Sequence, residues 1–369
     1  MSSQGRASNE PLLHVDDLTV TFGRHGEERF TAVDGVTFDV APGQTVGLVG
    51  ESGCGKSVTS LAIMRLLPRR GNTVTGSVRF AGEDLLTISD AQMRDRRGAD
   101  LAMIFQDPLS SLNPVIPLGV QVTEVLARHR QMKSGPARAR AVELLDKVGI
   151  PDPNRRLVDY AHQLSGGMRQ RALIAMALAC EPRLLIADEP TTALDVTIQA
   201  QILALLGELV SESGTALIMI THDLGVVAGL CDEVNVLYAG RIVERTTRHE
   251  LFATPRHPYT GGLLASIPRL DETRGRRLVP VPGSVSDNIP WAQGCAFAPR
   301  CSSEVPVCRS RTPELLPDED VADDRLLRCH HPLPPEGGTL VRDEAADEDD
   351  GLATGDSLGD DRRTTEAGR

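Results

Sequence analysis

Hydrophobic and polar residues alternate in some parts of the chain and form unbroken apolar runs in others. Residues 18–22 and 36–40 alternate, which predicts strands of an antiparallel sheet, and residues 71–82 are predicted to form a second short hairpin. The unbroken runs predict buried strands, because a strand covered on both faces needs no polar side. These runs lie at 45–49, 101–105, 184–187 and 216–220.

Helical spacing fills the intervals between these strands. Residues 57–67 are predicted to form a helix that ends before Pro68, and residues 118–180 are mainly helical. Asp195 stands where it could cap a further helix. The apolar stripe of that helix is Ile198, Ile202, Leu205, Leu206 and Leu209.

Polar side chains follow three of the buried runs. Gln106 follows the second run, Asp188 and Glu189 follow the third, and His222 follows the fourth. Open α/β sheets bind their ligands at the carboxyl ends of the strands, so these residues are candidates for one site. Taken singly, each has a plainer alternative, such as a solvated acidic pair or a structural histidine.

The loop after the first buried run fits the pattern G-x-x-x-x-G-K-[ST], which is typical of phosphate-binding P-loops. Its glycines allow successive N–H groups to point at phosphate oxygens. Lys56 is expected to reach the β- and γ-phosphates and Ser57 to ligate Mg²⁺, and the helix that follows favours an anion at its N-terminus. The predicted nucleotide-binding residues are Gly50, Ser52, Gly53, Cys54, Gly55, Lys56, Ser57 and Val58.

Composition and charge limit the classes of function. The chain has 369 residues, enough for two or three domains, and no run of 18 apolar residues that could span a membrane. Its polar start, residues 1–11, is expected to be a disordered leader, and the protein is expected to be cytoplasmic. The net charge of −12 gives no case for nucleic-acid binding. Residues 336–369 hold 11 acidic and four basic residues and are predicted to form a disordered acidic tail.

Taken together, these motifs resemble those of the ATP-binding cassette (ABC) ATPases over residues 12 to about 250. The most specific piece is Leu164-Ser165-Gly166-Gly167-Met168-Arg169-Gln170, which matches the signature that other P-loop families lack. Phe22 matches the A-loop, where many members carry Tyr. The remaining matches, in the family's order, are Gln106 (Q-loop), Asp188-Glu189 (Walker B), Ala193-Leu194-Asp195 (D-loop) and His222 (H-loop).

This resemblance implies an α/β P-loop NTPase cassette, with a RecA-like core, an antiparallel β-subdomain and a helical subdomain. Two cassettes would close head to tail, so that Ser165, Gly166 and Gly167 touch ATP bound to the partner. The resemblance assigns Mg²⁺ binding to Ser57, Gln106 and Asp188. Catalysis is assigned to Glu189 as general base, His222 at the γ-phosphate and Gln106, and nucleotide contacts to Phe22 and Asp195.

Two later stretches, His257-Pro258-Tyr259-Thr260 and residues 294–301, resemble the C-terminal extension of oligopeptide and dipeptide importer ATPases. The implied domains are a nucleotide-binding domain at 12–253, with its helical subdomain at about 107–180, and an extension at 254–335. The implied assembly has a second, different cassette, two membrane permease subunits and an extracytoplasmic binding protein. It would lie at the cytoplasmic face of the membrane, with the region from Gln106 to about Leu118 docked on the permeases.

Four of the seven cysteines cluster late in the chain, at spacings C-x5-C-x6-C-x20-C. Tight C-x2–4-C pairs, typical of zinc sites, are absent. Some members of the importer subfamily carry a 4Fe–4S cluster here, so the resemblance predicts such a cluster on Cys295, Cys301, Cys308 and Cys329. Zinc and free thiols remain alternatives, and a metal could serve only to fold this loop-rich segment.

Other functions remain open from the sequence. Related importers move nickel or other small solutes. Non-transport cassette proteins usually carry two cassettes in one chain or a long coiled coil between the two Walker motifs, and this chain has neither. A non-catalytic scaffold would be expected to lack Glu189 or His222, and both are present.

Overall fold

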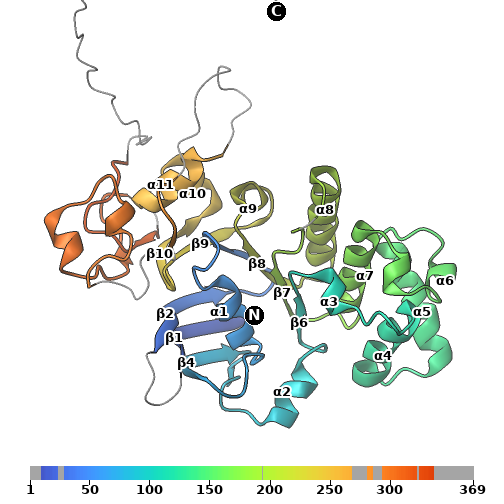
Figure 1. The fold of residues 1–369 in the computed structure, drawn as a ribbon. Coiled ribbons are helices and arrows are strands. Elements are labelled where there is room, and N and C mark those ends of the chain that lie inside the picture. Colours follow the sequence, from blue (N-terminus) through green and yellow to red (C-terminus); the bar gives the residue numbers. More distant parts are fainter. Residues whose placement is uncertain are drawn as a thin grey trace, which may run out of the picture.

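The structure, a computed structural model, describes residues 10–23, 29–192, 194–267, 281–285, 293–321 and 324–335. The predicted acidic tail, and the predicted leader apart from residues 10 and 11, lie outside these ranges. Two sheets and a lobe of helices make up the described part (Figure 1). No helix in it combines the length and apolar character needed to cross a membrane.

The larger sheet holds the predicted buried strands at its centre. Its order is β11-β12-β10-β9-β3-β8-β7-β6, and β9, β3, β8, β7 and β6 run parallel. β10 pairs antiparallel with β9 through a tight turn at Ala239-Gly240. The strands are β3 (Thr45–Val49), β6 (Leu101–Ile104), β7 (Leu184–Asp188), β8 (Ala216–Thr221), β9 (Glu233–Tyr238), β10 (Arg241–Thr247), β11 (Leu316–Pro317) and β12 (Leu326–Leu327).

The smaller sheet is antiparallel, as the alternating residues predict. Its order is β2-β1-β4-β5, with strands β1 (Leu13–Phe22), β2 (Phe30–Val40), β4 (Asn72–Phe80) and β5 (Glu83–Asp84). The prediction of a hairpin within residues 71–82 is wrong. Those residues form mainly the single strand β4, which pairs along its length with β1. A partner some 60 residues away along the chain leaves no local mark on the sequence.

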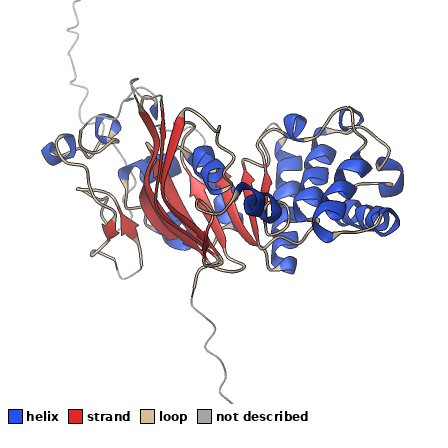
Figure 2. Cartoon of the chain, turned by 90° about the horizontal axis from the view of Figure 1, so that it is seen from below, coloured by secondary structure: helices blue, strands red, loops and turns tan. Residues whose placement is uncertain are grey.

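One face of the larger sheet packs against α1 and the antiparallel sheet, and helices cover the opposite face. Further helices form a separate lobe at the β6 edge of the sheet (Figures 1 and 2). The helices are α1 (Lys56–Ile63), α2 (Asp90–Arg96), α3 (Pro108–Ser111), α4 (Leu118–Arg130), α5 (Ser134–Lys147), α6 (Pro153–Arg156), α7 (Gly166–Leu178), α8 (Val196–Ser213), α9 (Leu224–Leu230), α10 (Arg248–Ala253) and α11 (Pro258–Ala265). Short 3₁₀ helices are η1 (Ala161–Gln163), η3 (Ala298–Arg300) and η4 (Pro306–Arg309).

Helix α1 ends four residues earlier than predicted. Arg65 has a left-handed backbone with φ of +49°, which stops the helix before Pro68. The guanidinium of Arg97 donates to the carbonyl oxygens of Met64 (2.9 Å) and Arg65 (2.7 Å). Arg97 therefore satisfies carbonyl groups that the helix end leaves without partners.

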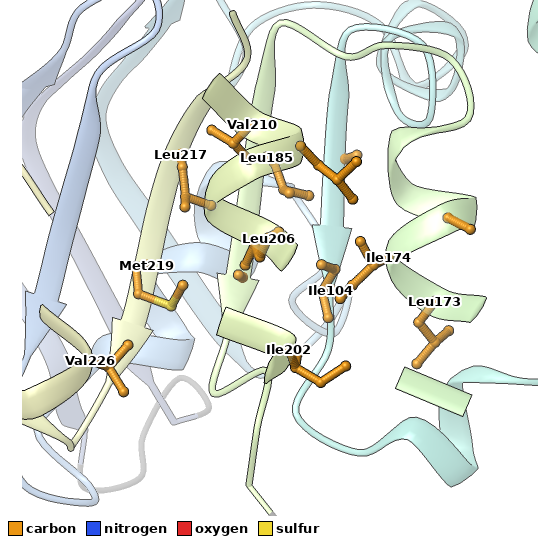
Figure 3. Packing of buried hydrophobic residues seen from close by; sticks show 14 of the residues in the cluster. Ile104, Leu173, Ile174, Leu185, Ile202, Leu206, Val210, Leu217, Met219 and Val226 are labelled. Carbon is orange, nitrogen blue, oxygen red and sulfur yellow. The ribbon is translucent and has the colours of Figure 1, made fainter. Parts of the chain in front are cut away.

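Successive residues of the buried strands face two different hydrophobic cores, because side chains alternate across a strand. Leu185 and Leu217 belong to the core under the helices, and Ile186 and Ile218 belong to the core between the larger sheet, α1 and the antiparallel sheet. Figure 3 shows Leu206 and its neighbours on α8 lying over these strands. Burial on both faces explains why the strands lack polar alternation.

The region after residue 254 joins the larger sheet at its edge. β12 pairs with β10 and β11 pairs with β12, both antiparallel. Buried ion pairs fasten the same region. Arg325 contacts Glu244 of β10 at 3.2 Å with both side chains 0% exposed, and Arg256 contacts Asp318 at 2.6 Å.

Replacing Leu206 by alanine is expected to destabilise the fold strongly. Leu206 is wholly buried, so the substitution leaves a cavity and should cost about 2–5 kcal/mol of unfolding free energy. Denaturant unfolding followed by far-UV circular dichroism measures the loss. Val196→Ala on the same helix is the control, because Val196 is 82% exposed. Equal losses in the two variants would contradict the packing of α8 described here.

Candidate functional site

The predicted P-loop lies between β3 and α1 and has a backbone shape that requires glycine. Gly50, Gly53 and Gly55 have φ angles of +153°, +83° and +101°. A Cβ on Gly50 would lie 2.3 Å from the carbonyl oxygen of Leu237, and one on Gly55 would lie 2.5 Å from that of Ala32. The loop is therefore packed closely against two other backbone segments.

Lys56, at the start of α1, folds back over this loop. Its Nζ donates to the carbonyl oxygens of Gly50 (2.7 Å) and Glu51 (2.9 Å), and the residue is only 5% exposed. The amino group of Lys56 therefore lies directly against the backbone of the loop.

The other predicted loop residues differ in exposure. Ser52 and Gly53 are exposed at the tip of the loop, and Val58 packs half-buried against the core under α1. Cys54 is fully buried, and this burial raises the pKa of its thiol in spite of the nearby Lys56. Cys54 is therefore a protonated packing residue and no nucleophile.

Ser57 and Asp188 meet beneath the loop. The Ser57 hydroxyl donates to Oδ1 of Asp188 at 3.0 Å, which joins the first turn of α1 to the end of β7. Asp188 is 5% exposed, and its burial raises the pKa of the carboxyl group. The hydroxyl of Ser57 and the carboxylate of Asp188 offer oxygen ligands of the kind that Mg²⁺ prefers.

Glu189 is the centre of a hydrogen-bonded cluster. Gln106 Nε2 donates to Oε2 of Glu189 at 2.9 Å, and Nδ1 of His222 lies 3.1 Å from Oε1. The Thr192 hydroxyl also donates to Oε2, at 2.9 Å. The structure thus brings together the three predicted catalytic residues from the ends of β6, β7 and β8.

The backbone of Glu189 is also unusual. Its φ is +44°, a left-handed conformation that is uncommon for a residue with a side chain. Its N–H donates to the carbonyl oxygen of Ile220 at 2.9 Å, which keeps the residue at the end of the sheet. Burial raises the pKa of Glu189, but the hydrogen bonds from His222 and Thr192 outweigh this, and the net shift is downward.

The predicted signature residues lie apart from the P-loop, in the helical lobe beyond β6 (Figure 1). Ser165 caps α7, with Oγ accepting the N–H three residues further on at 3.3 Å. Ser165 and Gly166 are exposed. A Cβ on Gly166 would lie 3.3 Å from Leu194, and one on Gly167 would lie 2.9 Å from Ile198. Within one chain, therefore, the signature packs against the D-loop and α8.

Two further predicted nucleotide contacts have structural roles. Asp195 caps α8 as predicted, with Oδ1 accepting the N–H of Ile198 at 3.0 Å. Ala193 lies outside the described residues. Phe22, at the end of β1, pairs across the sheet with Phe30 and packs against the core under α1.

The prediction of a 4Fe–4S cluster is wrong, and so is the zinc alternative. Among the described residues, no group of three or more His, Cys, Asp or Glu could hold a metal ion. Burial raises the pKa of the Cys295 thiol, and it raises the pKa of Cys301 to about 11 and of Cys329 to about 12. The burial of these three thiols disfavours the thiolate form, which is the form that binds a metal. Cys308 is likewise a free, buried thiol.

Aromatic packing holds this segment in place of a metal. Phe297 lies 5.2 Å from Tyr238 and 5.4 Å from Tyr259 between ring centroids, and His257 lies 5.8 Å from Phe297. Together with the buried ion pairs to β10, these contacts anchor the loops to the larger sheet.

Three further residues, Thr192, Arg300 and Tyr259, contribute to the site although no motif assigned them to it. Thr192 follows Glu189 by three residues, a spacing that brings the two together in a turn. Arg300 and Tyr259 both contact Glu51 of the P-loop. Both lie in the two stretches that resemble the importer extension, so that resemblance was the one available indication.

Comparison with known proteins agrees with the resemblance to ABC ATPases. Residues 33–192 match the family model for ABC transporters, and residues 243–308 match that for the oligopeptide/dipeptide transporter C-terminal region. The dipeptide transport ATP-binding protein DppD of Bacillus subtilis is 53% identical over 300 residues, covering 81% of this chain and 89% of that protein. DppD of Escherichia coli is 48% identical over 322 residues, covering 87% and 97%. Neither name mentions an iron–sulfur cluster.

Solved structures agree on the fold. The ATP-binding cassette MJ0796, solved as a dimer bound to ADP and Pi, has a TM-score of 0.57 and 28% identity, covering 64% of this chain and 98% of its own. The family matches, the identity to relatives over most of their length and the arrangement of the site lead to one conclusion. The chain belongs to the ATP-binding proteins of ABC transporters, in the branch that carries the oligopeptide/dipeptide transporter C-terminal region.

Proposed function

We propose that this chain is the ATP-hydrolysing subunit of an ABC importer that takes up oligo- or dipeptides. The observation that carries the ATPase is the convergence of Gln106, Glu189 and His222 beside the P-loop. The peptide cargo is supported by the C-terminal match and by relatives named as peptide and dipeptide transport proteins. Nothing in the site or the comparisons favours nickel or another small solute.

The P-loop fits the phosphates of ATP. Its glycines have backbone conformations that allow successive N–H groups to point at phosphate oxygens, and Lys56 supplies a cation at the same place. The carbonyl groups that now bind Lys56 are weaker partners than phosphate oxygens. Lys56 is therefore expected to turn from Gly50 and Glu51 to the bound nucleotide.

The oxygen atoms of Ser57 and Asp188 fit Mg²⁺, and Gln106 could supply a further oxygen from its amide group. When bound, Mg²⁺ supplies positive charge that offsets the charge of the phosphates. Burial raises the pKa of Asp188, and the hydrogen bond from Ser57 and the charge of Lys56 offset only part of that shift. The buried carboxyl group is held by Ser57 at the end of β7, where it could bind the ion.

Glu189 is proposed as the general base. Its lowered pKa keeps it ionised at neutral pH, so it can accept a proton from an attacking water. Thr192 and Gln106 fix one carboxylate oxygen, and His222 contacts the other. His222 remains 59% exposed, so its ring has room to reach a γ-phosphate above the loop. Catalysis here consists mainly of positioning and charge stabilisation.

The remaining predicted contacts require a second cassette. Ser165, Gly166 and Gly167 are proposed to contact ATP bound to the partner, since they lie at the start of α7, whereas the P-loop of their own chain leads into α1, which is drawn apart from α7 in Figure 1. The dimeric structure of MJ0796 supports this arrangement. Asp195 is proposed to contact the same interface, and Phe22 to stack on the base of the nucleotide.

The other subunits of the importer are proposed from the membership of this chain in the ABC transporter family. Permease subunits follow from membership of the ABC transporters. A different second cassette, an extracytoplasmic binding protein and a position at the cytoplasmic face of the membrane are finer proposals. Residues 12–253 are proposed as the nucleotide-binding domain, about 107–180 as its helical subdomain and 254–335 as the importer-type extension. The segment from Gln106 to about Leu118 is proposed to dock on the permeases.

Glu189→Gln should abolish ATP turnover and preserve ATP binding. The amide keeps the size of the side chain but cannot take the proton, so the rate should fall by about 10²–10⁴-fold. Phosphate release by the assembled importer measures turnover, and fluorescence of a labelled ATP analogue measures binding by the chain.

The matched control is Glu208→Gln, an exposed glutamate on α8 whose loss should leave both values unchanged. Turnover by the Glu189 variant within a few-fold of the unmodified protein would rule out Glu189 as the base.

Gly55→Ala should damage the P-loop more than Gly53→Ala. Both positions have positive φ, which costs a residue with a side chain about 1–2 kcal/mol. Only at Gly55 would the new Cβ also meet a backbone oxygen, at 2.5 Å, whereas at Gly53 nothing lies within 4 Å. Thermal unfolding without nucleotide compares the two, and equal melting temperatures would contradict the close packing of the loop.

A further inference from the structure

A residue of the P-loop is bonded to the C-terminal region of the chain. Glu51 occupies the first variable position of the loop, and Arg300 of η3 makes a two-point ion pair with its carboxylate. Nη1 of Arg300 lies 2.6 Å from Oε2 of Glu51, and Nη2 lies 2.9 Å from Oε1. A paired contact of this kind fixes direction as well as distance.

The other polar groups of Glu51 are also engaged. Its backbone N–H donates to the hydroxyl oxygen of Tyr259, on α11, at 2.8 Å. Its carbonyl oxygen accepts the bond from Lys56. Residues separated from the loop by more than 200 positions thus hold the side chain and the N–H of Glu51, while its carbonyl holds the lysine of the loop.

Arg300 is itself held firmly. Its side chain is 4% exposed, and it donates from Nε to the carbonyl oxygen of Pro282 at 2.6 Å and from Nη2 to that of Gly283 at 3.1 Å. Its guanidinium lies 5.7 Å from the ring centroid of Tyr238 and 6.0 Å from that of Phe297. An arginine fixed on so many sides loses little further freedom when it holds a partner.

The ion pair with Arg300 also neutralises the negative charge of Glu51. Glu51 is a carboxylate in a loop shaped to receive phosphates, and an unpaired negative charge there would repel them. Because Arg300 is buried, solvent and salt screen the pair less than they would a surface pair.

We propose that Arg300 and Tyr259, here called the Glu51 clamp, are positioning residues that give the P-loop its affinity for ATP. They hold Glu51 in place and neutralise it, so the C-terminal region contributes to nucleotide binding in this chain. The proposal rests on the ATPase function proposed above. It differs from a purely structural role, because it predicts that removing the carboxylate compensates for removing the arginine.

The test measures the dissociation constant of ATP for the full chain, using fluorescence of a labelled ATP analogue with Mg²⁺. Arg300→Gln leaves Glu51 unpaired and should weaken ATP binding by about 10- to 100-fold, the value of a hydrogen-bonded charge. Glu51→Gln/Arg300→Gln should recover binding to within about threefold of the unmodified chain, since the repelling charge is gone. Tyr259→Phe should weaken binding by about threefold, through loss of one neutral hydrogen bond.

The control is Arg309→Gln. Arg309 forms an exposed ion pair with Glu304 in the same region and makes no contact with the loop, so binding should not change. Melting temperatures without nucleotide identify variants that fail to fold. If Arg300→Gln does not fold, Arg300→Lys keeps the charge, loses the two-point geometry and should bind ATP with intermediate affinity.

Unchanged ATP binding in folded Arg300→Gln, or no recovery in the double variant, would overturn the clamp. Failure of the unmodified chain to bind ATP would instead overturn the proposed function. In the assembled importer, Arg300→Gln should raise KM for ATP and leave kcat within about twofold, because the clamp acts on binding. A fall in kcat at unchanged KM would also contradict it.

Discussion

The site depends on the register of four parallel strands. Asp188 lies opposite Ile220, Ile104 lies opposite Ala187, and Val49 lies opposite Thr221. Each strand therefore ends at the same level and delivers its next polar residue to one edge. A shift of one residue would turn every side chain to the other face. The two hydrophobic cores, which take alternate residues of the same strands, prevent that shift and so fix the distances around Glu189.

A buried carboxylate on β10, that of Glu244, holds the C-terminal region against the larger sheet. Glu244 is 0% exposed, accepts the backbone N–H groups of Arg256 and His257 at 3.0 Å each, and pairs with Arg325. Removing one partner of such a pair leaves a buried charge uncompensated, which costs about 3–5 kcal/mol. These pairs tie the region beyond β10 to the larger sheet, and the same region supplies both residues of the Glu51 clamp.

The sequence was sufficient for features that local pattern controls. Apolar runs identified β3, β6, β7 and β8, and the order of polar residues after them identified Gln106, Glu189 and His222. The sequence was insufficient where the structure of a segment depends on a partner far away in the chain. The pairing of β4 with β1, the early end of α1 under Arg97 and the bond from Arg300 to Glu51 all join segments far apart in the chain. The error at the four cysteines arose because spacing alone does not reveal burial, and burial raises the pKa of the thiols of Cys301 and Cys329.

The short strands β11 and β12 form one edge of the larger sheet, beyond β10. β10 has seven residues, and β12 pairs with two of them, Glu244 and Arg245, at the middle of the strand. The outermost strand is only two residues long, and one of them is Pro317, which has no N–H to donate. Short margins that contain proline resist strand-to-strand association between molecules. A chain truncated before residue 316 would leave Glu244 and Arg245 without their strand partner and would place β10, a longer strand, at this edge of the sheet.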